Sequence, residues 1–381
     1  MNMPRLDEKN KMLHSQVAKR IREQLESGAI GAGEKLETEN GLARKFGVSR
    51  PTIRQALSEL QQEGYIDRIH GKGTFVSGKI NSGELNHRQE KNIYMIVPHF
   101  SGNFIGRIAA GVQEVILERG YHLTLYATND QIEKEQAFIK ELIARRADGL
   151  IIHHTKAHYY NPAIFELYQK NIPIVMTGRY YRYLDTSFVV ADNYRGTYEA
   201  ISYLIGLGHR HIGLVCKKPT IETSQEDRIR GFLDALSDHN IVIQRNLLFT
   251  DLNDERSVYF VEQDENLEKR VQEQLKKFIE SSPEMTAVFA SNGLIAASII
   301  KTAKQCGRSV GSDLSVLGFD NDSFFASLDP ALTTIDWPTF EIGRRAAQIM
   351  IEQIENPSIG TRKEYLPTKL IIRESCANVS G

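Results

Sequence analysis

From residue 92 onward, short apolar runs alternate with amphipathic helical segments. No other feature of the sequence restricts its possible folds as strongly. Strands are expected at residues 93–97, 122–126, 149–153, 173–176, 211–215, 287–290 and 314–318, and helices near 105–119, 132–146, 161–170, 226–239 and 293–306. Repeated strand–helix units are typical of parallel sheets that helices cover on both faces. Residues 92–381 are numerous enough for two such α/β subdomains, so we expect two halves with a central cleft between them.

Chemically active side chains follow or flank several of these expected strands. They are His99, Phe100, Phe104, Arg179, Arg228, Asn292, Asp320 and Trp337. In open parallel sheets, ligands bind at the carboxyl ends of the strands. One arginine, asparagine or aspartate side chain can form two hydrogen bonds to the hydroxyl groups of a ligand. An aromatic ring can cover the C–H face of a sugar. The pattern predicts a site for a polyhydroxylated ligand.

Three of these residues have a structural alternative. Arg228 could form a surface ion pair, although Arg230 is better placed for one. Asp320 could belong to a turn, since Asn-Asp-Ser follows it. Trp337 is the only tryptophan and could belong to the core, but its position beside Pro338 after a short strand favours a pocket wall.

Metal and cofactor sites are not indicated. His153, His154 and His158 do not have the spacing of common zinc sites, and adjacent side chains of a strand point to opposite faces, so we expect a solvated loop there. Cys216, Cys306 and Cys376 are far apart without a CxxC pair, so we expect buried thiols and neither a disulfide nor a cysteine metal site.

The first 78 residues have a different pattern. Leu13, Val17, Ile21 and Leu25 define an amphipathic helix that Gly28 is expected to end. A second helix is expected to begin after Thr38, which can cap it, and to end at Gly47, followed directly by a third.

The third helix lies within residues 47–60. Ser49 can cap it, and Pro51 suits its first turn. Its apolar positions form one buried stripe, namely Ile53, Ala56, Leu57 and Leu60. The side chains of Arg50, Thr52 and Arg54 are on the exposed face of the helix, where they could contact DNA phosphates and base edges. The alternative is an ordinary solvent-exposed helix face.

Two short strands follow, at residues 65–69 and 74–76, joined by a glycine-containing turn at 70–73. Three helices and a hairpin make a winged helix-turn-helix, whose third helix can enter a major groove while the hairpin tip reaches flanking backbone or minor groove. For His70, an ordinary turn position is the alternative to a DNA contact.

Charge and composition fit this division. Residues 1–80 contain 14 Lys and Arg against 10 Asp and Glu, a net charge of +4, whereas the rest carries 33 against 38, a net charge of −5. Residues 79–91 are polar and lack periodicity, as in a linker. With neither a signal peptide nor an apolar run of about 18–20 residues that could span a membrane, a cytoplasmic location is expected.

Residues 12–76 resemble the GntR family of DNA-binding domains. The matching segments are 33–36, 39–43, 46–50, 52–54, 56–57, Gly64 and 71–76. The resemblance places Arg50, Thr52 and Arg54, with Pro51 among them, at DNA-contacting positions, and His70 and Gly71 at the wing tip. Asn40 occupies a position where many members have a base-reading arginine, and Glu37 one where proline is frequent.

Residues 92–377 resemble the LacI/GalR effector domain, which has the type I periplasmic-binding-protein fold. The matching segments include 192–196, 204–209, 228–232, 287–292, 315–320 and 330–335. By this resemblance Arg228, Asn292 and Asp320 bind ligand hydroxyls, while Phe104, Arg179 and Trp337 occupy positions that vary with the ligand. Gly293 replaces a usual aspartate, and Gly178 stands where some members carry a ligand-binding acid.

A GntR head on a LacI/GalR-type body resembles the arabinose repressor subfamily. The resemblance implies a homodimer that binds palindromic operator DNA and releases it when a sugar binds. Arabinose is favoured, and fucose, other monosaccharides and short oligosaccharides remain open. The alternative is a sugar-processing enzyme with a nucleic-acid-binding appendage, but the sequence lacks GxSxG, GxxxxGK[ST] and a GxGxxG after a strand.

Overall fold

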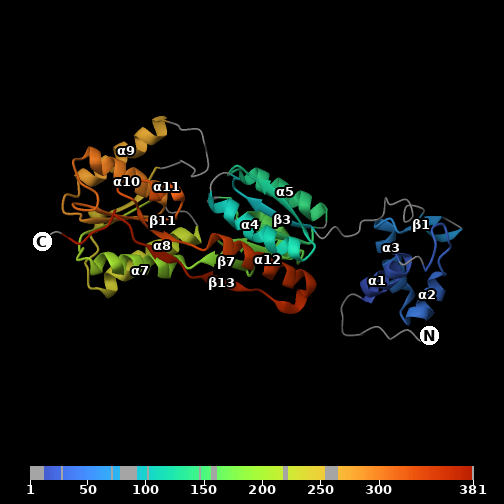
Figure 1. Ribbon diagram of the computed structural model, residues 1–381. Coiled ribbons are helices and arrows are strands. Elements are labelled where there is room, and N and C mark those ends of the chain that lie inside the picture. The colour runs from blue at the N-terminus through green and yellow to red at the C-terminus, as the bar shows by residue number, and fades with distance from the viewer. Residues whose placement is uncertain are drawn as a thin grey trace. The chain divides into compact units, whose positions relative to one another are not determined.

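A computed structural model shows two compact units, residues 1–90 and 91–381, hereafter the head and the body (Figure 1). It describes residues 13–26, 29–69, 72–77, 92–100, 103–145, 147–155, 161–217, 222–253 and 265–379. The expected linker at 79–91, the helix-ending Gly28, and His70 and Gly71 of the expected wing tip lie outside the described residues.

The head contains the predicted three helices and hairpin. These are α1 (Leu13–Glu26), α2 (Glu39–Phe46), α3 (Arg50–Gln62), β1 (Ile66–Ile69) and β2 (Gly73–Val76), with the two strands antiparallel. Thr38 Oγ1 accepts the Gly41 N–H at the start of α2, and Ser49 Oγ accepts the Thr52 N–H at the start of α3. Gly47 ends α2 with a φ of 69°, a left-handed conformation that glycine adopts without steric cost.

The core of the head confirms the predicted stripe of α3. Ile53, Ala56, Leu57 and Leu60 are all fully buried. They pack with apolar residues of the other elements, namely Val17, Ala18, Ile21, Leu25, Leu36, Leu42, Phe46, Ile66 and Val76. Because this stripe is buried, the opposite side of α3 is the one left for a partner.

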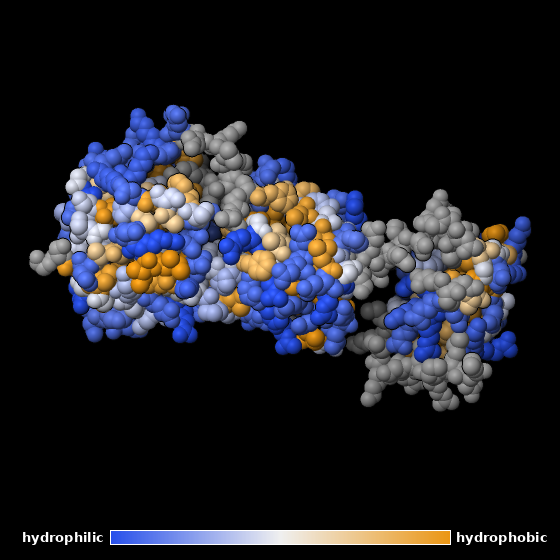
Figure 2. All heavy atoms as spheres, viewed as in Figure 1, coloured by the Kyte–Doolittle hydropathy of each residue, from blue (hydrophilic) through white to orange (hydrophobic). Residues whose placement is uncertain are grey.

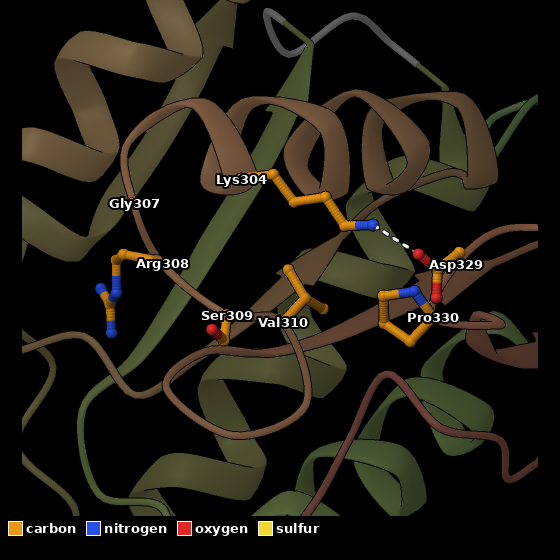
Figure 3. A pocket seen from close by; sticks show the side chains of 7 residues that line it. All are labelled: Lys304, Gly307, Arg308, Ser309, Val310, Asp329 and Pro330. Atoms are coloured by element: carbon orange, nitrogen blue, oxygen red, sulfur yellow. Dashed lines mark hydrogen bonds and ion pairs between the residues drawn. The ribbon is translucent and has the colours of Figure 1, made fainter.

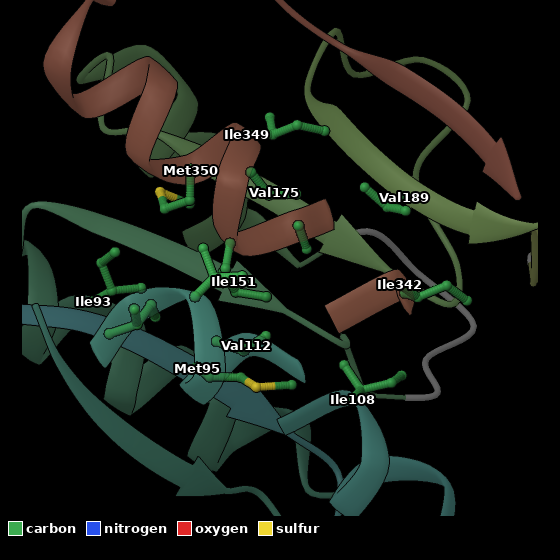
Figure 4. Packing of buried hydrophobic residues seen from close by; sticks show 14 of the residues in the cluster. Ile93, Met95, Ile108, Val112, Ile151, Val175, Val189, Ile342, Ile349 and Met350 are labelled. Carbon is green, nitrogen blue, oxygen red and sulfur yellow. The ribbon is translucent and has the colours of Figure 1, made fainter. Parts of the chain in front are cut away.

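The first half of the body is built on a parallel sheet with the strand order β13-β7-β6-β5-β3-β4. The strands are β3 (Asn92–Val97), β4 (His122–Ala127), β5 (Gly149–Ile152), β6 (Ile174–Thr177), β7 (Ser187–Ala191) and β13 (Lys363–Leu366). Helices α4 (Asn103–Glu118) and α12 (Thr339–Glu355) cover one face, where the buried residues of Figure 4 interdigitate. Helices α5 (Ile132–Ala144) and α6 (Pro162–Gln169) cover the other face.

The second half has the same plan, with the strand order β14-β12-β11-β10-β8-β9. Its strands are β8 (Ile212–Lys217), β9 (Leu248–Leu252), β10 (Ala287–Ala290), β11 (Ser315–Phe319), β12 (Thr333–Asp336) and β14 (Lys369–Ile371), and only β14 runs antiparallel to its neighbour. Helices α7 (Asn193–Gly206) and α8 (Thr223–Asp238) cover one face, and α9 (Glu265–Glu280) and α10 (Gly293–Gln305) the other; α11 (Ser323–Ala326) is a single turn. The predicted fold of two parallel-sheet halves is confirmed.

The chain crosses between the halves three times, at residues 191–193, 336–338 and 366–369. After β12 the chain returns to the first half as α12, and β13 then pairs with β7 before β14 pairs with β12 in the second half. These three segments form the covalent junction of the body. Two halves joined by short crossings can move relative to each other about them.

The surface of the body has scattered apolar side chains. On the face that Figure 2 shows, hydrophobic residues form separate patches among hydrophilic ones. The most exposed large apolar side chains of the body come from unrelated elements and include Tyr183, Val242, Leu117 and Ile372. Among the described residues, no helix is both long enough and apolar enough to cross a membrane.

Candidate effector site and DNA-binding face

The strand orders locate the candidate site in each half. In the first sheet β4 and β5 lie on opposite sides of β3, and in the second β9 and β10 lie on opposite sides of β8. The order reverses at β3 and at β8, and ligands of open α/β sheets bind outside the carboxyl ends at such switch points. The residues after β3, β5, β8 and β10 are therefore the first to consider.

Arg228, on α8, connects three elements of the second half at this edge. Its Nε donates to Asn193 Oδ1 over 2.9 Å, and its Nη1 donates to the Ser291 carbonyl over 2.6 Å. Its guanidinium lies 3.4 Å from the centroid of the Phe319 ring. Asn193 begins α7 at a chain crossing, Ser291 follows β10, and Phe319 ends β11. Arg228 is thus fixed in orientation beside the junction.

Arg230 behaves as expected for the alternative role. Its side chain is 57% exposed, lies 3.6 Å from an oxygen of Asp227, and covers the Tyr194 ring. The two arginines of α8 therefore differ in environment, since Arg228 is inserted among three elements and Arg230 is a surface residue.

Asn292 and Asp320 follow neighbouring strands. Asn292 caps α10, its Oδ1 accepting the Ile295 N–H, so its amide NH2 is the group left to donate. Asp320 adopts a left-handed φ of 83°, and its Oδ2 accepts weakly from the Gly293 N–H at 3.5 Å. The helix turn after it is capped by Asp322 instead. Asp320 therefore does have a turn conformation, as its alternative predicted, but it is not a cap.

The structure explains why position 293 is a glycine, where the resembled family usually has an aspartate. A Cβ atom at this position would overlap the Phe325 ring, so this chain has no room for the usual aspartate. The close approach of Phe325 to α10 takes the space instead.

Phe104 and Trp337 bring the two halves together. Their rings stack with centroids 4.2 Å apart, and His153 contacts Phe104 edge-on at 5.2 Å. Phe104 begins α4, His153 follows β5, and Trp337 lies in a crossing between the halves. Trp337 also packs against the hydrophobic cores of both halves. The core alternative for Trp337 is therefore confirmed, and its role as a pocket wall stays a prediction.

Arg179 is buried and spans the two halves. Its Nη2 lies 3.0 Å from His153 Nε2, and its Nη1 lies 3.1 Å from Glu222 Oε1. The second contact has the distance of an ion pair without the alignment of a hydrogen bond. Glu222 precedes α8 in the second half. Arg179 follows Gly178, whose φ of 72° and lack of a Cβ leave space for the His153 ring.

The expectation of a solvated histidine loop was wrong for two of the three residues. His153 and His154 are 5% and 4% exposed, and His154 stacks on Tyr181. Burial, with a contribution from the Arg179 charge, lowers the pKa of His154 to about 3, so it is neutral near pH 7. His158 lies outside the described residues. Among the described residues there is no cluster of three His, Cys, Asp or Glu that could hold a metal.

All three cysteines are free, and Cys216 and Cys376 are buried as expected, whereas Cys306 is partly exposed. Burial raises the pKa of both buried thiols to about 12, so they stay protonated near neutral pH.

Sequence reasoning missed several partners at this edge, namely Asn193, Glu222, Ser291 and Phe319. Asn193 belongs to a motif of the LacI/GalR resemblance, but nothing in the sequence paired it with Arg228. The side chain of Glu222 is only 14% exposed, and its partner is 43 residues earlier in the chain. The Arg179–Glu222 pair depends on how the two halves dock, and the Arg228 contacts depend on how elements of the second half pack; no local pattern encodes either.

The second half also has a separate concave region, whose lining side chains Figure 3 shows. Its volume is about 440 Å3, and it is lined by Lys304, Gly307, Arg308, Ser309, Val310, Asp329 and Pro330. Residues 306–314 connect α10 to the amino end of β11, so this region is at the edge away from the strand ends that carry Asn292 and Asp320. None of the candidate ligand residues lines it, and we do not assign the effector to it.

In the head, the exposed side of α3 carries the predicted DNA-contacting arginines. The side chains of Arg50 and Arg54 are 56% and 59% exposed. Both approach Glu39 at the start of α2, at 3.5 and 3.3 Å, and Arg68 of β1 reaches the same carboxylate at 3.5 Å. One carboxylate therefore gathers three guanidinium groups on one face.

Three of the other predicted contacts lie on α2 and α3. Asn40 and Pro51 are exposed, and Thr52 is half-buried with its hydroxyl 2.7 Å from Ser49 Oγ. The positions of His70 and Gly71 stay predictions, since both lie outside the described residues. Arginines at the amino end of an exposed helix are suited to enter a major groove of DNA.

The cluster predicts a pH dependence for the head. The hydrogen bond from Arg54 is the main cause that lowers the pKa of Glu39 from 4.5, with the charges of Arg54 and Arg68 adding to it and burial opposing it. A carboxyl with a lowered folded-state pKa stabilises the fold above its unfolded pKa and loses that contribution as the pH falls through the folded value. Glu39→Gln should therefore destabilise the head at pH 7 and cost progressively less below about pH 4.5.

Denaturant titrations of the full chain can measure this. Trp337 lies in the body, so its fluorescence reports the body, while circular dichroism reports both units. A difference between wild type and Glu39→Gln that stayed constant from pH 7 to pH 3 would contradict the prediction.

A head of this type and a two-half α/β body define a DNA-binding regulator with an effector domain. Residues 13–76 match the model of the bacterial regulatory proteins of the gntR family, and residues 201–376 that of the periplasmic binding protein-like domain. An arabinose metabolism transcriptional repressor from Geobacillus stearothermophilus is 31% identical over 98% of this chain and all of its own length. One from Halalkalibacterium halodurans is 28% identical over 96% of both chains.

A LacI family transcriptional regulator from Enterococcus faecium, solved with bound ribose, is similar to the body. It is 27% identical, with a TM-score of 0.63 over 76% of this chain and all of its own length. This chain therefore belongs to the family of bacterial transcriptional regulators in which a GntR-type head precedes a LacI/GalR-type effector domain.

Proposed function

We propose that this chain is a sugar-responsive transcriptional repressor of carbohydrate-utilisation genes. The observation that carries the proposal is the setting of Arg228, held by Asn193 and Ser291 over Phe319 beside the junction. A fixed guanidinium at strand ends can donate to two hydroxyls at once. The names of the relatives, which are repressors of arabinose metabolism, support a repressor.

The effector we propose is a neutral monosaccharide, with arabinose first and fucose and other sugars to be tested against it. Arg228, Asn292 and Asp320 would bind hydroxyls, and Phe104, Trp337 and Arg179 would choose among sugars. A stacked aromatic pair suits the C–H face of a sugar ring. Among similar proteins, one carries bound ribose and another is named a ribose operon repressor, so pentoses are the first class to test.

The mechanism we propose is a shift between two arrangements of the halves. Sugar would bind more tightly when the halves are closed, and closure would change the spacing of the two heads in a dimer on a palindromic operator. A ligand moves such an equilibrium only by its differential affinity for the two states. Operator release is the proposed direction.

An Arg50→Ala variant tests the DNA face. If Arg50 makes a bidentate contact with guanine, the variant should lose about 1–3 kcal/mol of operator affinity and tolerate changes at one base pair. Gel shifts on the native operator and on single-base variants measure both effects. An equal loss on all sequences would instead identify a phosphate contact, with a shallower salt dependence.

The function itself is tested by a sugar panel. Thermal shift with arabinose, fucose, ribose, xylose and galactose should give one strong hit, and that sugar should release the protein from its upstream DNA in a gel shift. Chromatography of the sugar afterwards separates the two classes of function. A repressor returns the sugar unchanged, whereas consumption of the sugar would favour the enzyme alternative.

A further inference from the structure

The segment after β6 is docked onto the first turns of α8, although the two belong to different halves. Tyr180 N–H donates to Thr223 Oγ1 over 3.2 Å, and that hydroxyl lies 3.4 Å from the Tyr180 carbonyl oxygen. Arg182 Nε donates to Glu226 Oε2 over 3.0 Å, and its Nη2 donates to Asp227 Oδ1 over 3.0 Å. We call this set, together with the Arg179–Glu222 pair, the clasp.

The first-half side of the clasp is firmly supported. The Tyr180 ring stacks on Phe188 of β7 with centroids 4.0 Å apart and an interplanar angle of 10°. Its hydroxyl lies 2.9 Å from that of Tyr365 on β13. The backbone that carries Arg182 is therefore anchored to two strands of the first sheet.

The second-half side carries the buried charge. Asp227 is 6% exposed, and its Oδ1 lies 3.0 Å from Arg182 and 3.6 Å from Arg230. Burying a carboxylate costs free energy unless hydrogen bonds from charged donors satisfy it. Loss of Arg182 would therefore weaken the attachment of Asp227 to the first half. The Arg182 side chain is 36% exposed, which makes this link sensitive to salt.

The clasp is next to the candidate effector residue. Asp227 precedes Arg228 in the first turns of α8, so the same helical turn faces the first half through Asp227 and the second half through Arg228. The covalent crossings at residues 191–193, 336–338 and 366–369 are elsewhere in the chain. A movement that parts the halves must break the clasp, because it joins them without a chain connection.

We propose that Arg182 is a positioning residue for the effector response, holding the Arg228-bearing turn of α8 against the first half through Asp227 and Glu226. The inference rests on the proposed function of the Arg228 site. The clasp raises the fraction of molecules that are closed before sugar arrives. Apparent ligand affinity scales with the fraction of the competent state, so the clasp sets the sugar concentration at which the protein responds.

The test uses the full chain with Arg182→Gln. For the sugar that the wild type binds, calorimetry should give an apparent affinity about tenfold weaker, with operator binding in the absence of sugar retained. Wild-type sugar affinity should fall with added salt, and that dependence should be shallower in the variant. Arg182→Lys, which keeps the charge, should recover part of the affinity.

The matched control is Arg195→Gln. Arg195 pairs with Glu199 within α7 at 2.7 Å and is 74% exposed, so this variant removes an ion pair inside one half. Its sugar affinity should equal that of the wild type. Equal affinity and equal salt dependence in wild type, Arg182→Gln and Arg195→Gln would overturn the proposal.

A measurement without sugar separates this inference from the proposed function. Small-angle X-ray scattering of the full chain should show a larger mean separation of the two halves in Arg182→Gln than in the wild type at low salt. The wild type should approach the variant at high salt. Identical scattering at both salt concentrations refutes the clasp, and an expanded variant supports it even if no sugar in the panel binds.

Discussion

An Arg228→Ala variant is expected to bind operator DNA normally and to lose its release by sugar. The guanidinium joins Asn193 and Ser291 and covers Phe319, and in the proposed function it also donates to the hydroxyls of the ligand. Hydrogen bonds from a charged donor contribute about 1.5–3 kcal/mol, so sugar affinity should fall about 10- to 150-fold. Calorimetry gives the loss of affinity, and a gel-shift titration with sugar gives the loss of release.

Two variants make this result specific. Arg228→Lys keeps the positive charge but loses the planar fork that reaches two acceptors, so it should remain impaired. Arg230→Ala, two residues further along α8, removes an exposed guanidinium and should respond as the wild type does. Normal release of Arg228→Ala at wild-type sugar concentrations would remove Arg228 from the site.

The elements of this fold could be predicted where the signal was local. The caps Thr38 and Ser49, the stripe from Ile53 to Leu60, and the alternation of strands with helices all depend on residues within one or two turns of each other. Strand β7, the return of α12 to the first half and the pairing of β13 with β7 were not predicted. They depend on contacts between distant segments, for which periodicity carries no information.

The candidate site shows the same limit at the level of side chains. The chemistry of Arg228, Asn292 and Asp320 follows from their residue types and their positions after strands. The burial of His153 and His154 could not be deduced in this way, because it arises from Arg179, Phe104 and Tyr181, which come from other elements. The exposure of these two histidines depends on how separate elements of the first half pack together, and not on the local segment.

The second large effect is expected at Gly111, where α4 crosses α12. A Cβ at Gly111 would overlap the backbone oxygen of Phe340, and one at Gly343 would overlap the backbone oxygen of Ile108. Backbone atoms cannot rotate away as a flexible side chain can, so Gly111→Ala must push the helices apart. We expect a loss of about 3 kcal/mol in the free energy of unfolding of the body, measured by denaturant titration with Trp337 fluorescence.

A Gly106→Ala substitution, five residues earlier, should instead raise the free energy of unfolding of the body. Gly106 is also in α4 but exposed, and a Cβ there would meet no atom within 4 Å. Alanine is favoured over glycine in a helix, so Gly106→Ala should stabilise the body by about 0.5–1 kcal/mol. Equal effects at Gly106 and Gly111 would contradict the close crossing. Because α4 begins at the Phe104 end and α12 begins just after Trp337, Gly111→Ala should also disturb their stacking and weaken sugar binding, whereas Gly106→Ala should leave it intact.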